Sequence, residues 1–238
     1  MTRAQVELLL KKFVGRMKRD YQKNLVFVIH HGSWATGEAT PESDIDFLVG
    51  LKKVEREDLI KLKKILREKQ YHKATVLLFS ALDMENYIPY GRHQFHFGAK
   101  FLYGKLSLAK PTRSQEILEI KKHADEIGFW GRYLFTHRHP RDRVVRSIYW
   151  RLKEVIICLR VYVSLKTGKY PITRRSLKQA LNDSKDKELV RISENWIKHQ
   201  PKLMKDPDPV LLKLADFSQR TLRKLKVLSS KKRAKAVP

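Results

Sequence analysis

The stretch from Val26 to Val49, VFVIHHGSWATGEATPESDIDFLV, decides the fold of this chain. The apolar, largely β-branched run from Leu25 to Ile29 is typical of a buried strand. Gly32 and Ser33 follow soon after, and a glycine lets the backbone turn sharply and approach a ligand closely. A loop rich in Gly, Thr, Pro, Glu and Ser comes next. The run from Asp44 to Val49 then predicts a second strand.

Two aspartates stand at the start of this second strand. Asp44 and Asp46 are two residues apart, so in an extended chain their side chains leave the same face. Neighbouring carboxylates repel each other unless a cation neutralises them, and hard oxygen ligands on a rigid strand suit Mg²⁺. The amides around Gly32 and Ser33, with the Ser33 hydroxyl, can hold phosphate oxygens beside that metal. A phosphate-binding turn next to paired aspartates is typical of phosphoryl or nucleotidyl transfer with two metal ions.

The spacing of these residues resembles a known family. Gly32-Ser33, then ten residues, then Asp44-Ile45-Asp46 resembles the signature of the nucleotidyltransferase superfamily with a DNA polymerase β-like palm. The resemblance covers roughly the first hundred residues and implies an α/β palm, a mixed sheet with flanking helices. It also implies Asp44 and Asp46 as catalytic Mg²⁺ ligands, with Gly32 and Ser33 on the nucleotide. Minimal nucleotidyltransferases usually carry the same flanking residues that occur here, Ala35, Gly37, Pro41 and Ser43.

The third expected strand departs from the family pattern. The run from Thr75 to Phe79 predicts this strand, and Thr75 aligns where the family carries a third Asp or Glu. Asp83 and Glu85 follow the strand and would need a different geometry, and Ser80 with Asp83 has capping-box spacing. Without a third carboxylate, two metal ions share fewer negative ligands and the acceptor hydroxyl loses its nearest base. This departure bears on catalysis and not on the fold.

The other apolar residues of the first half predict elements that complete the palm. Spacings of three and four residues indicate two covering helices, over residues 2–22 and 56–69. Aromatic residues from Phe95 to Tyr103 predict a further strand that ends at Gly104. We therefore expect a nucleotidyltransferase catalytic domain over residues 1–109.

The second half of the chain has helical periodicity throughout. Residues 110–228 predict an all-α bundle, in which Gly168 ends a long central helix. The arrangement is similar to that of aminoglycoside nucleotidyltransferases, in which a helical domain presents the acceptor to the palm. Residues 229–238 are basic and contain no core-forming side chains, so we expect a disordered tail. The expected helices include residues 117–127, 144–165, 172–182, 189–199 and 210–228.

Several aromatic and imidazole side chains allow a structural or a functional interpretation. Trp130, Trp150 and Trp196 lie in or beside apolar stripes, so we expect them in the core rather than as base-stacking platforms. His30 and His31 border the expected site, where packing or phosphate contact is a simpler role than metal binding.

The charge of the chain favours an anionic partner. The net charge is +26. Residues 1–109 contain 19 basic and 12 acidic residues, hence +7, and the remainder contains 32 and 13, hence +19. A field of this strength attracts nucleic acids and repels polycations such as aminoglycosides, although solubility alone can also select for charge. An RNA end is therefore the acceptor that we expect.

Composition also bounds the location of the protein. No apolar run reaches the length of a membrane span, and no signal-peptide core follows the first residue. Cys158 is the one cysteine, so no internal disulfide can form, and its apolar neighbours predict a core thiol. We expect a cytoplasmic protein with no membrane partner; the sequence leaves its oligomeric state open.

Three hypotheses for function follow. The first is an enzyme that uses two Mg²⁺ ions to transfer a nucleoside monophosphate from an NTP, which we expect to be ATP, to an acceptor hydroxyl. The second is a degenerate nucleotidyltransferase that binds nucleotide or nucleic acid, or acts as an antitoxin-like module, because its third carboxylate is missing. The third is a nucleotidyltransferase of the aminoglycoside type that acts on a small molecule. Residue 75 discriminates between the first two hypotheses, and the charge of the helical half weighs against the third.

Overall fold

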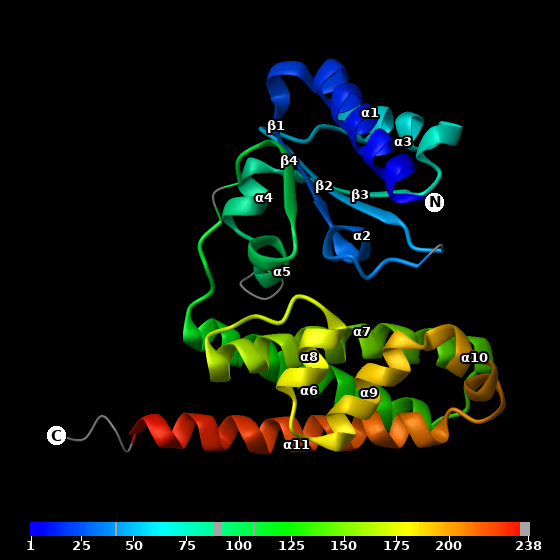
Figure 1. Ribbon diagram of the computed structural model, residues 1–238, viewed down its shortest axis with the longest axis vertical. Coiled ribbons are helices and arrows are strands. Elements are labelled where there is room, and N and C mark those ends of the chain that lie inside the picture. The colour runs from blue at the N-terminus through cyan, green and yellow to red at the C-terminus, as the bar shows by residue number, and fades with distance from the viewer. Residues whose placement is uncertain (41, 88–91, 107, 234–238) are drawn as a thin grey trace. The chain divides into compact units, whose positions relative to one another are not determined.

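A computed structural model describes residues 1–40, 42–87, 92–106 and 108–233, and of residues 229–233 it describes the backbone alone. The chain divides into two compact units, Met1–Pro111 and Thr112–Pro238 (Figure 1). Pro41, one of the positions that resemble the family, and residues 234–238 of the expected tail lie outside the described residues.

The first unit is built on a four-stranded mixed sheet with the strand order β3-β2-β1-β4 (Figure 1). β1 runs antiparallel to β2 and to β4, whereas β2 and β3 run parallel. The predicted α/β class, a mixed sheet with flanking helices, is confirmed. The strands are β1 Leu25–His31, β2 Ile45–Leu51, β3 Ala74–Ser80 and β4 Lys100–Gly104.

Two helices cover one face of this sheet. They are α1, Arg3–Tyr21, and α3, Arg56–Leu66, and two short 3-10 turns, η1 Gln22–Asn24 and η2 Lys69–Tyr71, follow them. Phe13 of α1 stacks on Phe47 of β2 with ring centroids 4.0 Å apart, and both side chains are fully buried. Burying one such side chain stabilises the fold by roughly 1.5–3 kcal/mol. The helical spacing predicted for both segments is thus confirmed.

Two shorter helices cover the opposite face. They are α4, Ala81–Glu85, and α5, Arg92–Phe97, and they bury Met84 and Phe95 against Phe27, Ile29 and Leu48. The expectation of a strand from Phe95 onward is wrong, because Phe95 lies in α5 and β4 begins only at Lys100. In the helix Phe95 packs on the sheet while His93 and Phe97, one turn apart, stack at 6.1 Å.

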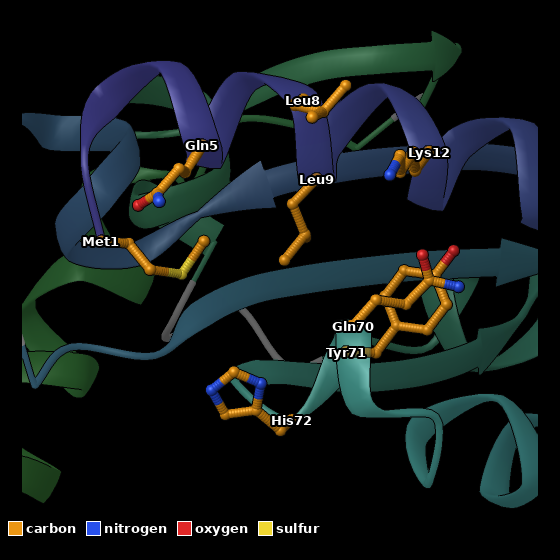
Figure 2. A pocket seen from close by; sticks show the side chains of 8 residues that line it. All are labelled: Met1, Gln5, Leu8, Leu9, Lys12, Gln70, Tyr71 and His72. Atoms are coloured by element: carbon orange, nitrogen blue, oxygen red, sulfur yellow. The ribbon is translucent and has the colours of Figure 1, made fainter.

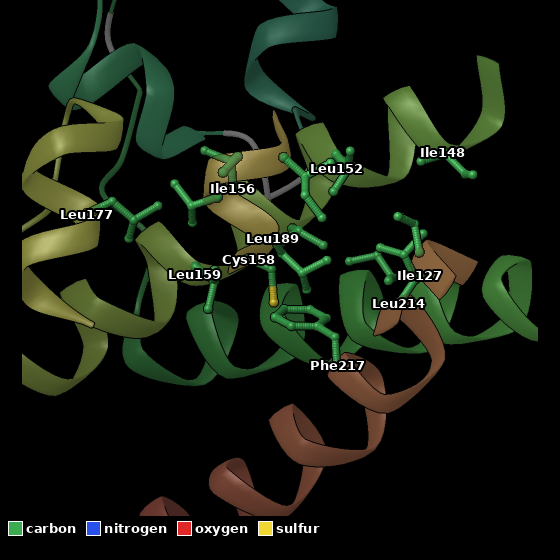
Figure 3. Packing of buried hydrophobic residues seen from close by; sticks show 14 of the residues in the cluster. Ile127, Ile148, Leu152, Ile156, Cys158, Leu159, Leu177, Leu189, Leu214 and Phe217 are labelled. Carbon is green, nitrogen blue, oxygen red and sulfur yellow. The ribbon is translucent and has the colours of Figure 1, made fainter. Parts of the chain in front are cut away.

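The second unit is entirely helical. Its central helix α7 contributes eleven buried residues to the core, and Gly168 ends it in a left-handed conformation with φ +73°. Cys158 lies in this core beside Leu159, Leu189 and Phe217, as predicted (Figure 3). The helices are α6 Arg113–Thr136, α7 Arg141–Thr167, α8 Arg174–Ala180, α9 Ser184–Glu194, α10 Trp196–Lys205 and α11 Asp208–Arg233.

The helical unit differs from the sequence-based expectation in three places. Residues 189–199 do not form one helix, because the chain leaves the helical conformation at Asn195, between α9 and α10. α11 continues to Arg233, so the first five residues of the expected disordered tail are helical; Lys and Arg are good helix formers, and no Gly or Pro interrupts them. Trp130 and Trp196 pack against the core as expected, but Trp150 is 52% exposed.

None of the helices in the described part of the chain combines the length and the apolar character that a membrane crossing requires.

Candidate active site

The Gly32–Ser33 turn lies at the end of β1, where the helical turn α2, Gly32–Thr36, begins. Gly32 has φ +77°, a conformation that side chains disfavour. A Cβ atom at this position would lie 2.0 Å from Oδ2 of Asp46. Glycine is therefore required twice here, for the backbone conformation and because the Asp46 carboxylate occupies the space of a side chain.

Hydrogen bonds fix the loop between this turn and β2. The Trp34 indole Nε1 donates to the Ser43 carbonyl at 3.3 Å. The Ser43 hydroxyl accepts a hydrogen bond from the Thr40 amide at 2.9 Å. Because Ser43 directly precedes Asp44, these contacts set the position from which the chain enters β2.

The two aspartates occupy different environments. Asp44 is exposed and lies one residue before β2, whereas Asp46 is half-buried and belongs to the strand. Asp46 pairs with His31 of β1 and with Thr75 of β3. Side chains of residues paired across neighbouring strands leave the same face of the sheet. The structure thus brings Asp46, Gly32, His31 and Thr75 together, on the face that α4 and α5 cover further along.

The register makes Thr75 the β3 residue directly beside Asp46. β3 is described throughout and contains no Asp or Glu. Asp83 of α4 does not substitute for one, because its carboxylate accepts hydrogen bonds from the amide and the hydroxyl of Ser80, both at 2.7 Å. These bonds hold the pKa of the Asp83 carboxyl below its ordinary value and complete the predicted capping box.

His31 is the site neighbour to which sequence reasoning gave no specific role. It is 9% exposed, its ring lies 5.7 Å from that of Phe95, and burial lowers its pKa to about 4. Among the described residues, Nε2 of His31 has no hydrogen-bond partner. His30 is on the opposite face near Phe47, and burial lowers its pKa to about 4 as well. Both imidazoles are therefore neutral at pH 7. The alternation of β1 was the signal that would have placed His31, and not His30, beside Asp46.

The carboxylates of Asp44 and Asp46 are the candidate ligands for Mg²⁺. Mg²⁺ is commonly bound by one or two carboxylates together with water and substrate phosphates. Asp44 and Asp46 fit this requirement for one ion. No group of three or more His, Cys, Asp or Glu side chains with metal-binding placement occurs among the described residues. A second ion would have to rely on the substrate for most of its ligands.

A separate hollow of about 300 Å³ lies between α1 and η2 (Figure 2). The residues that line it include Leu9 of α1 and Tyr71 of η2. None of Gly32, Ser33, Asp44 and Asp46 lines it, so it is not the candidate site.

Comparisons with known proteins agree with this fold. Residues 10–94 match the family model described as "Nucleotidyltransferase domain". A solved structure described as "spectinomycin adenyltransferase AAD(9) from Enterococcus faecialis with ATP and spectinomycin" is similar, with a TM-score of 0.54 and 14% sequence identity. The alignment covers 93% of this chain and 99% of that chain; at this identity the likeness concerns the fold. No curated protein matches the chain.

The fold and the family match define the class of the protein. Residues 10–94 of the chain form a nucleotidyltransferase domain, as the Gly-Ser turn and paired aspartates predicted. This domain is of the kind found in transferases that use a nucleoside triphosphate.

Proposed function

We propose that the protein transfers a nucleoside monophosphate from an NTP, which we take to be ATP, to an acceptor hydroxyl and releases pyrophosphate. Asp44 and Asp46 are the proposed catalytic and Mg²⁺-binding residues, and Gly32 and Ser33 are the proposed nucleotide-binding residues. The observation that carries the proposal is that the Asp46 carboxylate lies directly against Gly32. This contact puts the proposed metal ligand next to a turn whose backbone amides can bind phosphate oxygens.

Each residue of the site has a distinct task in this proposal. The Gly32–Ser33 turn holds the triphosphate through its backbone amides and the Ser33 hydroxyl. Asp46 is fixed by its place in β2, and exposed Asp44 can adjust to the bound nucleotide. Asp44 and Asp46 would hold Mg²⁺, which would neutralise negative charge that develops on the phosphates; a second ion, which we propose on family grounds, would add to this effect. Neutral His31 fills the sheet face beside Asp46 without adding a charge that would compete with the metal.

The weak point of the site as a catalyst is Thr75. A threonine hydroxyl does not accept a proton at neutral pH, so β3 offers no general base for the acceptor hydroxyl. General-base catalysis typically contributes about 10²- to 10⁴-fold to a rate. We therefore infer a slow transferase. The second candidate, a binding module without catalysis or an antitoxin-like component, is favoured by this same residue.

The acceptor that we propose is RNA. Residues 112–238 contain 31 basic and 13 acidic residues, hence +18, and such a surface attracts polyanions. The alternative, a small-molecule acceptor, is supported by the similar structure solved with ATP and spectinomycin, although 14% identity does not transfer a substrate. The charge is a property of this chain itself, so we give it greater weight.

The function is tested by label transfer. The full chain is incubated with each NTP labelled at its α-phosphate, with Mg²⁺, total cellular RNA and a panel of aminoglycosides that includes spectinomycin. We expect label to enter RNA, with ATP as the preferred donor. We expect no transfer of label by the variant in which Asp44 and Asp46 are changed to asparagine. Label that enters a drug and not RNA would establish the small-molecule alternative. No label in any acceptor, with Mg²⁺-dependent ATP binding retained, would establish the binding module.

A further inference from the structure

The corner between α6 and α7 carries a row of aromatic rings that extends beyond the core, against which Tyr133 packs. Phe129, Tyr133 and His137 lie one helical turn apart along α6 and its C-terminal cap, and we refer to them as the aromatic row. The rings of Phe129 and Tyr133 are almost parallel, 8° apart in plane with centroids at 5.7 Å. Tyr133 in turn stacks on His137 at 4.5 Å. Phe129 is 55% exposed and His137 is exposed, so the row presents ring surface to solvent.

Arginines surround the end of this row. Residues 132–146 contain five arginines and one acidic residue, and all five arginines are exposed. Arg138 follows His137 directly, and Arg141 and Arg143 stand in the first turn of α7. We refer to Arg138, Arg141 and Arg143 as the arginine corner.

The arginine corner is not explained by ion pairing. Arg151, further along α7, pairs with Glu154 at 2.8 Å, but no carboxylate pairs with the arginine corner among the residues that the structure describes. Cations are also unfavourable near a helix N-terminus, where the dipole is positive. Arg141 and Arg143 stand at that end of a 27-residue helix. Mutual repulsion and the dipole both oppose this arrangement, which Asp142 in the same turn offsets in part, and a bound anionic partner would relieve both.

We propose that the aromatic row and the arginine corner together form a docking surface for single-stranded RNA. Exposed ring faces stack with unpaired bases, and exposed guanidinium groups pair with phosphates in bidentate fashion. A duplex hides its base faces inside the helix, so it would meet the arginines alone. The eight helical steps from Phe129 to His137 span about 12 Å, enough for a few stacked nucleotides.

The surface also has a direction. Asp125 is exposed and lies one helical turn before Phe129, so the phosphates of a bound strand are repelled at that end. They are attracted toward the arginine corner.

This inference deepens the proposed function, since it names where an RNA acceptor would dock, and it rests on that function for the choice of RNA. Its test uses neither NTP nor catalysis, so the two proposals fail separately.

The test of the aromatic row is binding of a fluorescent single-stranded RNA of about 12 nucleotides to the full chain, followed by anisotropy, with the matching duplex as competitor. We expect Phe129→Ala to weaken binding at least about fivefold, because one stacked base contributes about 1–3 kcal/mol. Phe135→Ala is the matched control, since Phe135 is 43% exposed on the same helix but outside the row. We expect the control to bind like the unaltered chain and the duplex to compete poorly.

The test of the arginine corner is the salt dependence of the same binding. The triple change Arg138→Gln, Arg141→Gln and Arg143→Gln should lower the slope of log K against log salt by about 2, because each single-strand phosphate contact contributes about 0.7. The matched control removes the same charge from α10 through Lys198→Gln, Lys202→Gln and Lys205→Gln, and all three of these lysines are exposed. We expect the control to keep most of the slope.

Several results would overturn the proposal. If Phe129→Ala binds RNA as tightly as the unaltered chain, the aromatic row does not contact RNA. If the two triple variants lower the salt slope equally, the arginine corner contributes no more than any other positive charge on the protein. Competition by the duplex as strong as by the single strand would exclude base stacking. A change in oligomeric state of Phe129→Ala, measured by sedimentation, would mark the surface as an interface between copies. Transfer of label to RNA without these binding effects would leave the proposed function intact and reject this surface.

Discussion

Gly32 gives the sharpest test of how the site is built, because a single methyl group would fill the space that Asp46 occupies. In Gly32→Ala, the new Cβ would lie 2.0 Å from Oδ2, 2.9 Å from Cγ and 3.1 Å from Cβ of Asp46. An ordinary contact is at least 3.4 Å, so the carboxylate oxygen must move by about 1.4 Å. Rotation of the carboxylate about its own bond does not relieve the contact at Cγ. Relief requires a change of the Asp46 rotamer that moves Cγ, and the contact at Cβ requires a further shift of a few tenths of an ångström.

The chain contains a matched control for the backbone term. Gly37 has φ +76°, almost the value at Gly32, but nothing lies within 4 Å of the Cβ that alanine would add. Each alanine should cost roughly 1–2 kcal/mol of stability through the left-handed conformation. Only Gly32→Ala should also displace Asp46, and a misplacement of about 1 Å in a catalytic group can cost about 10²-fold in rate.

Two measurements on both variants separate these effects. Urea unfolding followed by circular dichroism should show that both variants lose a comparable free energy of unfolding through the left-handed backbone. Any additional loss in Gly32→Ala is due to the clash with Asp46. Calorimetry with ATP and Mg²⁺ should show binding close to that of the unaltered chain for Gly37→Ala and a loss of binding for Gly32→Ala. Equal nucleotide affinity in the two variants would refute the claim that the contact between Gly32 and Asp46 organises the site.

Three further outcomes follow from the structure. Thr75→Asp should raise label transfer, because it places a carboxylate beside Asp46; pyrophosphate release that stays at the level of the unaltered chain would show that residue 75 does not limit the rate. Burial raises the pKa of Glu154 to about 7 from an ordinary 4.5. Its contribution to stability is therefore complete below pH 4.5 and lost as the pH rises through about 7. The free energy of unfolding in urea should therefore depend less on pH across this range in Glu154→Gln than in the unaltered chain. Identical dependence in the two proteins would exclude the raised pKa of Glu154. Gly128→Ala should destabilise the helical unit by about 1–3 kcal/mol, because its Cβ would lie 2.4 Å from the Ser218 hydroxyl; an unchanged urea midpoint would contradict this packing.

The palm could be predicted because its signals are local. A glycine turn between two apolar runs fixes the strands, the turn and the face of Asp46 within the stretch from Val26 to Val49, whereas Asp44 lies one residue before β2. The alignment of Thr75 needed only the start of the third apolar run, and the parallel register placed it beside Asp46.

Other features depend on tertiary contacts that a sequence pattern does not reveal. Phe95 and Phe97 alternate like strand residues, but the position of Phe95 against Ile29 selects a helix. The break at Asn195 carries no proline or glycine signal, and the Asn195 side chain there donates a hydrogen bond to the carbonyl of Arg191. Trp150 lies beside an apolar stripe and yet faces solvent with Lys153 4.6 Å from its ring centroid.

The central claim is that Asp44 and Asp46 form a nucleotide site with the Gly32–Ser33 turn, and one calorimetric comparison tests it most directly. ATP with Mg²⁺ is titrated into the unaltered chain, into Asp44→Ala with Asp46→Ala, and into a control that loses the same two charges from exposed Asp125 and Asp142. We predict saturable, Mg²⁺-dependent binding to the unaltered chain and to the control, and none to the site variant at unchanged circular dichroism. Equal affinity in all three proteins would contradict the claim.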